Sequence, residues 1–380
     1  MLMTSIALTQ ENTGSLSQMS TTEIEFLFCG DTMLGREHLR VNPFASVLPI
    51  IRKADVAFCN LETALVSDGH PSLKRHVIAT PAENLDQLVA SGFHIVNLAN
   101  NHVLDQGEAG CQQLIESLQS KGIETVGLQD SGRSRPVILS RKGIKIGFLG
   151  YADYGFRTTL MPLRERIALK DVADLRKRVD CVVVSLHWGF EYVEFPSPQQ
   201  QRFAHRLIDA GAEMVIGHHP HVVQGTEQYH DGLIAYSLGN FQFRINLGDD
   251  FLNTGTGIML RVCRPVQGRL RYEAIPIKLS GSDEVELIPV EDLHSITARP
   301  GDLSGNRISR LRWTREVSRL WFPTQLESWF FRVRQFGGMQ WLRMFRWLFR
   351  PENLCYLLLY LAGPKHNSSR SLFHRRSHGE

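Results

Sequence analysis

The chain has 380 residues, of which 43% are hydrophobic and 21% are charged. This composition is that of an ordinary globular protein and excludes an intrinsically disordered one, and the length allows one large domain with an appendage. The formal net charge of +3 is too small to indicate a nucleic-acid-binding protein.

The first 23 residues contain no Lys or Arg and no sustained apolar stretch. A secretory signal needs a basic start and an apolar centre, and a transmembrane anchor needs a long apolar run. We therefore expect residues 1–23 to be a flexible leader and the protein to be cytoplasmic.

Strand-like and helix-like segments alternate from residue 24 to about residue 220. The strand-like runs are rich in Val, Ile and Phe and are apolar on both faces, which is typical of buried sheet strands; they cover 24–30, 55–60, 94–100, 144–151, 181–186 and 213–217. Helical patterns cover 81–92, 105–122 and 196–211. This alternation predicts an α/β layered fold.

Two details of the helical patterns are informative. Gly92 is placed as a C-cap of the first pattern. The second begins at Asp105 with Glu108 three residues later, so we expect Asp105 to cap that helix as part of a capping box.

After residue 222 the pattern becomes β-like, over 232–243, 255–265 and 268–279. We expect hairpins that pair at the edge of the same assembly or build a second sheet. Residues 24–300 are then one domain.

From about residue 304 the chain is rich in Trp, Phe, Leu and Arg, which predicts a helical extension over 301–363 followed by a disordered basic tail, 364–380. Its longest uncharged apolar run, 354–362, is too short to span a bilayer. Two interpretations stay open. The helices cap the domain core or form a dimer face, or residues 329–362, with five arginines and one acidic residue, make peripheral contact with the inner face of a membrane.

Polar side chains follow nearly every buried strand at its carboxyl end. They are carboxylates, amides and imidazoles: Asp31, Asn60, Glu62, Asn100, Asn101, His102, His187, His218, His219, His221 and Asn240. Any one of them alone could be a structural group. Because ligands bind beyond the carboxyl ends of strands in open α/β sheets, six such strand ends together predict one shared site.

The segment GHHPHV, residues 217–222, suits metal chelation. Pro220 biases His219 towards an extended backbone, in which residues two apart share a face. We therefore expect His219 and His221 to point the same way. His218 then points to the other side, as a bystander or as a supporting group.

Carboxylates, an amide oxygen and imidazoles, without a nearby thiolate cluster, suit Mn²⁺, Fe or Zn²⁺ in a reactive site better than a structural zinc. Two such metal ions a few ångströms apart would activate water and neutralise a phosphate. The sequence therefore predicts a divalent-metal site. The expected partner is a small-molecule phosphoester or an anionic polymer, since the small net charge argues against nucleic acid.

Six motifs together resemble one known family. They are GDTMLGR (30–36), NLE (60–62), NLANNHVLDQG (97–107), HWGFEY (187–192), GHHPHVVQG (217–225) and YSLGNFQF (236–243). In this order, over roughly 24–280, they resemble the CapA-type poly-γ-glutamate capsule biosynthesis proteins, a branch of the calcineurin-like metallophosphoesterase fold. The resemblance implies a four-layer αββα sandwich with a metal-type site at the strand ends, here followed by the C-terminal helical extension.

The resemblance also implies roles for particular residues. The implied metal ligands are Asp31, Glu62 as a bridging carboxylate, Asn101, His187, His219 and His221. The implied catalytic residues are His102, as the general acid that assists the leaving group, and Asp31. The implied substrate contacts are Arg36, Asn60, Glu191 and Asn240. Adjacent side chains of an extended segment point apart, so Asn100 is expected to brace its loop rather than to share the roles of Asn101 and His102.

The chain departs from the phosphoesterase pattern in two motifs. Met33 occupies the position of a usual histidine ligand, and NLE replaces the usual Gly-Asp-x-x-Asp. Three functions are therefore compared: a metal-dependent phosphoester hydrolase in capsule or poly-γ-glutamate production, a phosphatase unconnected with capsule, and a non-catalytic binding or assembly factor that holds an anionic polymer in the same pocket.

Overall fold

The structure is a computed structural model. It describes residues 23–35, 37–66, 72, 74, 76–153, 160–244, 254–281, 283–289, 309–336 and 338–362. The leader up to residue 22, the basic tail and Arg36 lie outside the described residues, so the predictions for them are not tested. The limits of the predicted domains also stay predictions.

Within the described residues, the first sheet has eight strands. Along the sheet they follow the order β18 (Val285–Leu287), β17 (Arg271–Leu279), β16 (Thr256–Arg264), β1 (Ile24–Thr32), β2 (Val56–Leu61), β5 (Ile95–Asn97) and β6 (Glu124–Val126), and β15 (Asn240–Gln242) also pairs with β1. From β1 to β6 the pairs are parallel, whereas β16, β17 and β18 form antiparallel pairs that extend the sheet.

The second sheet of the described chain has six strands. Their order is β13 (Thr226–Tyr229), β14 (Gly232–Ala235), β12 (Met214–His218), β11 (Cys181–His187), β10 (Ile144–Ala152) and β9 (Val137–Arg141). The four central strands are parallel, and an antiparallel strand closes each edge. Two short ribbons lie outside the sheets: β3 (Ala64–Leu65) with β4 (Ala79–Thr80), and β7 (Gln129–Asp130) with β8 (Arg133–Ser134).

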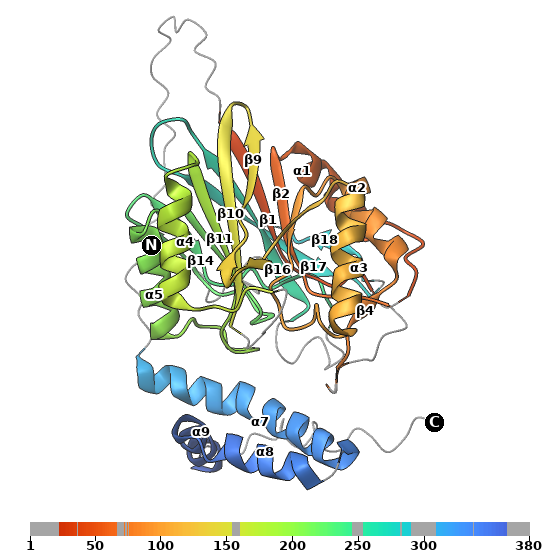
Figure 1. The fold of residues 1–380 in the computed structure, drawn as a ribbon, viewed down its shortest axis with the longest axis vertical. Coiled ribbons are helices and arrows are strands. Elements are labelled where there is room, and N and C mark those ends of the chain that lie inside the picture. The colour runs from red at the N-terminus through yellow and green to blue at the C-terminus, as the bar shows by residue number, and fades with distance from the viewer. Residues whose placement is uncertain are drawn as a thin grey trace, which may run out of the picture.

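Helices cover the outer face of each sheet (Figure 1). The first sheet carries α1 (Leu48–Lys53), α2 (Asp86–Ser91) and α3 (Gly107–Ser120), with short 3₁₀ turns at Ala45–Val47 and Ala82–Leu85; the second carries α4 (Glu165–Arg176) and α5 (Pro198–Asp209).

In strand β1, successive side chains point alternately to the two faces of the sheet, and this alternation explains the layers. Phe26 and Phe28 point into the apolar core between the two sheets, whereas Leu27 and Cys29 point to the core under the helices. Burying both faces of the strand requires a layer on each side, and the predicted four-layer αββα sandwich is confirmed.

Most predicted elements are present, with shifted ends. The six strand-like runs correspond to β1, β2, β5, β10, β11 and β12, and the three helical patterns to α2, α3 and α5. Gly92 does end α2 in a left-handed conformation, with φ of 94°. The late β segments do both things expected of them, since β16 to β18 extend the first sheet and β13 and β14 join the second.

The predicted cap at Asp105 is wrong. Helix α3 begins at Gly107, its N-cap residue is Gln106, and no side chain caps it. The sequence patterns also missed α1 and α4, as well as the edge strands β9 and β13.

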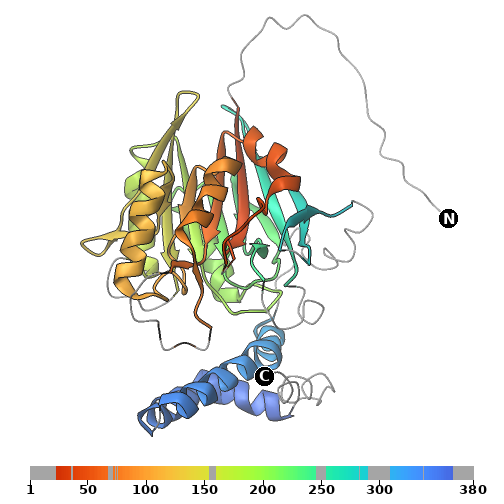
Figure 2. The ribbon, with the colours of Figure 1, turned by 90° about the vertical axis from the view of Figure 1, so that its right-hand side faces the viewer.

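Three helices form the C-terminal extension: α7 (Arg310–Phe336), α8 (Gly338–Leu348) and α9 (Pro351–Ala362). Figures 1 and 2 show them as a separate layer beyond one end of the sandwich, the end at which the arrow of β10 points. They pack on the loop that follows β11, where Val193 joins Trp313, Phe322 and Tyr356 in one apolar cluster. Among the described residues, no helix combines the length and apolarity needed to cross a bilayer.

Candidate metal centre

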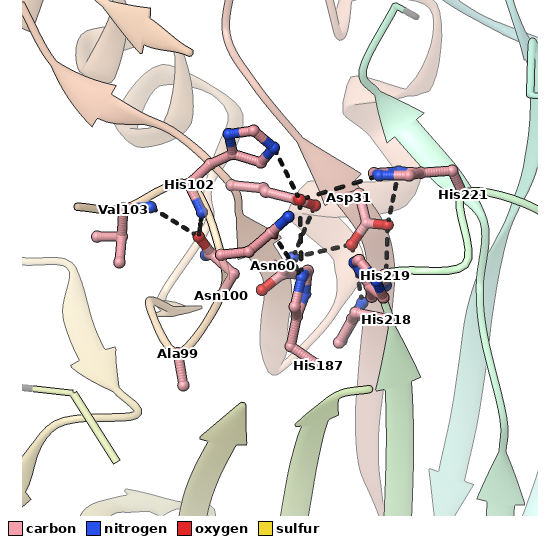
Figure 3. Close-up of polar contacts among 12 residues, drawn as sticks. Asp31, Asn60, Ala99, Asn100, His102, Val103, His187, His218, His219 and His221 are labelled. Carbon is pink, nitrogen blue, oxygen red and sulfur yellow. Dashed lines mark hydrogen bonds and ion pairs between the residues drawn. The ribbon is translucent and has the colours of Figure 1, made fainter. Parts of the chain in front are cut away.

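Strand ends from both sheets meet at this end of the sandwich (Figure 3). In the first sheet, Asp31 of β1 is in register with Asn60 of β2 and with Asn240 of β15. In the second sheet, His187 of β11 is in register with His218 of β12. The sheet topology therefore brings together polar residues separated by up to about two hundred positions in the sequence.

Two glycines allow the close approach of these strands. A Cβ atom on Gly30 would lie 2.0 Å from the carbonyl oxygen of Gly239, and one on Gly217 would lie 1.9 Å from that of Tyr236. Each glycine immediately precedes a site residue, Asp31 or His218. A side chain at either position would push the strands apart, so the glycines of the CGD and IGH segments are required by the site; the sequence analysis did not single them out.

The carboxylate of Glu62 lies at the centre of the cluster. Its Oε1 atom is 3.6 Å from Nε2 of His187, 3.9 Å from Nε2 of His221 and 4.0 Å from Nε2 of His102. Among the residues that the structure describes, this buried atom has no hydrogen-bond partner. Burial, together with the nearby Asp31 carboxylate, raises the pKa of Glu62 well above its ordinary value.

Asp31 is held by hydrogen bonds from two directions. Its Oδ1 atom accepts a hydrogen bond of 2.8 Å from Nδ2 of Asn60, and its Oδ2 atom accepts one of 3.2 Å from the backbone N–H of His219. Nδ1 of His221 lies 3.3 Å from the same Oδ2. Burial alone would raise the pKa of Asp31, but the contacts with His221 and Asn60 outweigh it and lower that pKa, so the group is ionised.

His187 connects the two sheets through asparagines. Nδ2 of Asn60 donates to its Nδ1 over 3.2 Å, because Oδ1 of Asn60 already accepts from Asn97. Nε2 of His187 lies 2.9 Å from Oδ1 of Asn101. Burial and the neighbouring histidines lower the pKa of His187 well below its ordinary value, which keeps the ring neutral.

The expected extended backbone at His219 is wrong. His219 has φ of 98° and His221 has φ of 58°, both in the left-handed region. Tertiary contacts override the local preference set by Pro220: the N–H of His219 is bonded to Asp31, and the carbonyl of Pro220 accepts from the N–H of Tyr192. Both imidazoles nevertheless reach the cluster, as predicted, although by a different backbone path.

Two groups of ligand-type atoms result, each with all members within 4.8 Å of one another. One contains Glu62, His219 and His221, and the other contains Asp31, Glu62 and His187. Glu62 is common to both. The buried cluster therefore contains two adjoining groups of donor atoms that could hold metal ions.

The imidazole of His102 contacts Asp105 on one side and faces the cluster on the other. Its Nδ1 atom lies 2.6 Å from Oδ2 of Asp105, which also accepts from the backbone N–H of Ile78. Lys74 donates to the other carboxylate oxygen of Asp105 over 2.7 Å and to the backbone carbonyl of Asn101. Asp105, expected as a helix cap, is thus part of the site, and its i, i+3 spacing from His102 is the sequence signal that could have indicated this.

These contacts set the protonation of Asp105 and His102. Burial would raise the pKa of Asp105, but His102 and Lys74 outweigh it and lower that pKa. Burial lowers the pKa of His102, against the opposing effect of Asp105. Because an ionised carboxylate only accepts, Nδ1 of His102 carries a proton and Nε2 faces Glu62.

Asn100 braces the loop, as expected. Its Oδ1 atom accepts from the backbone N–H groups of His102 and Val103, at 3.1 and 3.0 Å, and its Nδ2 atom donates to the carbonyl of Leu61 (Figure 3).

Two of the predicted substrate contacts, Asn240 and Glu191, lie beside site residues. Nδ1 of His221 lies 2.9 Å from Oδ1 of Asn240, so this amide contacts a site histidine directly, as Asn60 does. The carboxyl of Glu191, whose pKa burial raises, is close enough to act electrostatically on Glu62 and His221. The roles predicted for the site residues, as ligands, proton donor and substrate contacts, stay predictions.

Two further side chains bear on the predicted ligand set. His218 lies behind Asp31, with Nδ1 at 3.6 Å from Oδ1 and its ring beside Phe58, so it supports the cluster rather than facing it. Met33, at the position of a usual histidine ligand, packs with Ile78 and Phe243 in a small apolar cluster.

Comparison with known proteins gives consistent results over more than half of the chain. The family model described as "Bacterial capsule synthesis protein PGA_cap" matches residues 25–244. The "Capsule biosynthesis protein CapA" of Bacillus anthracis is 31% identical over 241 residues, and the match covers 56% of this chain and 58% of that protein. The "PGA biosynthesis protein CapA" of Bacillus subtilis (strain 168) is 29% identical over 272 residues, covering 66% and 70%. The chain thus matches less than two thirds of the length of the first of these relatives.

Solved structures give weaker similarity. A phosphatase from Mycoplasma pneumoniae is 14% identical, with a TM-score of 0.44 over 71% of this chain and 96% of that one. A hypothetical protein from Thermus thermophilus is 20% identical, with a TM-score of 0.43 over 66% and 99%.

Proposed function

Because the chain belongs to the PGA_cap family of bacterial capsule synthesis proteins, we propose that it acts in producing a capsule or poly-γ-glutamate-type polymer through a metal-dependent phosphoesterase site. The substrate class that we propose is a phosphoester. The two Bacillus relatives are named as biosynthesis proteins, and this supports the biological context rather than the chemistry.

The observation that carries the proposal is the buried Oε1 atom of Glu62. It faces three imidazole Nε2 atoms within about 4 Å and accepts no hydrogen bond from the described residues. A buried carboxylate oxygen without a partner is costly, and a cation held by carboxylates and imidazoles removes that cost. The residues present therefore fit a divalent metal ion.

The identity and number of ions follow from the donor atoms. Carboxylate oxygens and imidazole nitrogens without thiolates favour Mn²⁺, Fe or Zn²⁺. We propose two positions that share Glu62: one with Asp31 and His187, the other with His219 and His221. The amide oxygen of Asn101, next to Nε2 of His187, is a further ligand for the first.

When bound, the metal would polarise a phosphoryl oxygen and lower the pKa of a water molecule. The chain's own residues supply the proton transfer and the positioning. Asp105 fixes the ring of His102 with Nε2 towards the pocket, and its charge offsets part of the burial that lowers the pKa of this imidazole; once protonated, Nε2 donates its proton to the leaving oxygen of the phosphoester. Lys74, bonded to both Asp105 and the backbone of Asn101, holds these two neighbours in one arrangement.

The position of Met33 favours a second candidate function. Met33 packs into an apolar cluster, so β1 contributes the Asp31 carboxylate without the usual imidazole two residues later. A weaker metal position on this side would suit a non-catalytic factor that binds an anionic polymer.

Metal analysis of the purified protein, combined with hydrolysis of p-nitrophenyl phosphate and bis(p-nitrophenyl) phosphate under added Mn²⁺, Fe²⁺ or Zn²⁺, tests both candidates. Bound metal, and activity lost in Asn101→Ala and in His187→Ala but kept in His230→Ala, would support the hydrolase; His230 is an exposed histidine away from the cluster. Bound poly-γ-glutamate without hydrolysis would favour the binding factor. Protein that binds none of these metals and shows no activity with any of the added ions would contradict the hydrolase proposal.

A further inference from the structure

Helix α8 is attached to α7 by one face only. Met344, Trp347 and Leu348 point inward, and the ring of Trp347 stacks on Phe322 at 5.6 Å and lies 6.1 Å from Trp329. These contacts fix the orientation of α8, so its remaining two faces are held outward.

One outward face is apolar and aromatic. Its residues, which we call the aromatic face, are Phe330 of α7 with Trp341, Leu342, Phe345 and Phe349. Ring contacts connect the aromatic members in series, from Phe330 to Trp341 at 6.5 Å, to Phe345 at 6.0 Å and to Phe349 at 6.2 Å. Leu342 and Phe349 are 67% and 66% exposed. A connected apolar patch of this kind marks an interaction surface.

The other outward face of α8 is basic. Arg343, Arg346 and Arg350 are all exposed and are spaced three and four residues apart, which places them on one side of the helix. Among the described residues, no carboxylate forms an ion pair with them. At 100° per residue this arginine face lies directly beside the aromatic face.

An anionic lipid surface matches both faces at once. Aromatic side chains insert at the boundary between headgroups and acyl chains, while arginines on the adjacent face bind lipid phosphates. A second copy of the chain docking face to face would bring two arginine rows together, which like charges oppose. A polar polymer would leave the aromatic face in water.

We propose that the aromatic and arginine faces of α8, with Phe330, form a docking surface for membranes that contain anionic lipids. The helix lies in the plane of the interface, and the protein is held at the bilayer surface. The opposite side of the helical extension contacts Phe190 and Val193, a few residues after His187. Docking therefore holds the end of the sandwich that carries the metal centre near the membrane.

Co-sedimentation of the full chain with vesicles tests this surface. We expect the protein to pellet with vesicles of phosphatidylcholine and phosphatidylglycerol, to stay in the supernatant with phosphatidylcholine alone, and to be released by high salt. Two surface variants, Leu342→Ser with Phe345→Ser and Phe349→Ser, and Arg343→Gln with Arg346→Gln and Arg350→Gln, should each lower the partition coefficient about tenfold or more.

Matched variants on the sandwich separate the surface from general effects. Val266→Ser removes an equally exposed apolar side chain, and Arg178→Gln with Arg202→Gln and Arg269→Gln removes the same charge. Both should bind as the wild type does, and all variants should keep its circular dichroism spectrum. Equal pelleting of the surface and control variants, or no binding by the wild type, would overturn the proposal. So would self-association in the absence of lipid that the serine variant alone abolishes, since a second copy would then be the partner.

Discussion

His102 and Asp105 form a buried pair, with Nδ1 of the imidazole 2.6 Å from Oδ2 of the carboxylate. The pair fixes which ring nitrogen faces the carboxylate cluster, because Nε2 is left 4.0 Å from Oε1 of Glu62. Asp105 acts through His102 and has no ligand-type contact of its own with the cluster in the described residues.

Asp105→Asn should therefore weaken both the fold and the proposed reaction. We expect the free energy of unfolding to fall by about 1–3 kcal/mol, because the hydrogen bonds to His102 and Lys74 lose their charged acceptor. Phosphoester hydrolysis should fall on the order of 10²-fold while the metal content stays unchanged. Glu108→Gln is the control, because a capping box needs Glu108 as well as Asp105; an effect there as large as that of Asp105→Asn would restore the capping interpretation.

Glu62→Gln should change the stability in opposite directions with and without metal. In metal-free protein the ionised carboxylate is disfavoured by burial, so the variant should be as stable as the wild type or more stable. Wild-type protein should gain about 2.7 kcal/mol at a cation concentration of 100 times Kd, and the variant should lose most of that gain. Thermal unfolding with EDTA and with Mn²⁺ measures both, and a full gain in the variant would show that Glu62 holds no cation.

Acid should destabilise the metal-free protein through the buried imidazole of His218. Burial lowers the pKa of His218 to about 4, with only partial opposition from Asp31. Between pH 6.5 and 4 the unfolded chain binds a proton that the folded chain does not. The contribution of His218 to stability is therefore full above pH 6.5 and falls by about 1.4 kcal/mol per pH unit below it. Urea unfolding at pH 7, 6 and 5 measures this slope.

His218→Gln should reduce that slope by about one proton, whereas His230→Gln, at an exposed position, should leave it unchanged. An unchanged slope in His218→Gln would mean that this ring is protonated in the folded protein.

Phe190→Ala should loosen the helical extension while leaving the sandwich folded. The ring of Phe190 lies 5.4 Å from that of Trp313 and 4.5 Å from that of Trp321, and both contacts are edge-on. Losing them should cost about 1–3 kcal/mol of docking free energy. Hydrogen exchange should then rise in α7 and α9 but not in β11, and the exposed Phe330→Ala should have no such effect. Unchanged exchange in Phe190→Ala would show that the extension is held elsewhere.

The strand ends were predictable from sequence because they depend on local pattern. Apolar runs define β1, β11 and β12, and a polar residue at the end of a buried strand needs a shared partner. The resemblance of six motifs then supplied the layered fold, which the two sheets and their helices confirm.

The rest depends on contacts that have no local signature. Asp105 lies three residues before Glu108, which fits a helix cap, and three residues after His102, which fits a carboxylate–imidazole pair. Only the position of His102 in the folded chain decides between the two. The substrate contacts expected of Asn60 and Asn240 stay predictions. Their observed contacts, with Asp31 and with His221, are set by strand register, which the local sequence pattern does not give. Arg36 lies outside the described residues.

The backbone at His219 and His221 has a consequence for which substitutions the GHHPH segment tolerates. Both residues are held at positive φ, where any side chain with a Cβ atom is strained and glycine is not. Alanine at either position would lose the imidazole and keep that strain, on the order of 1 kcal/mol, whereas glycine would lose the imidazole and the strain together. Among variants without these imidazoles, glycine should therefore be more stable than alanine at residues 219 and 221, the reverse of the usual order of the two residues in helices and strands.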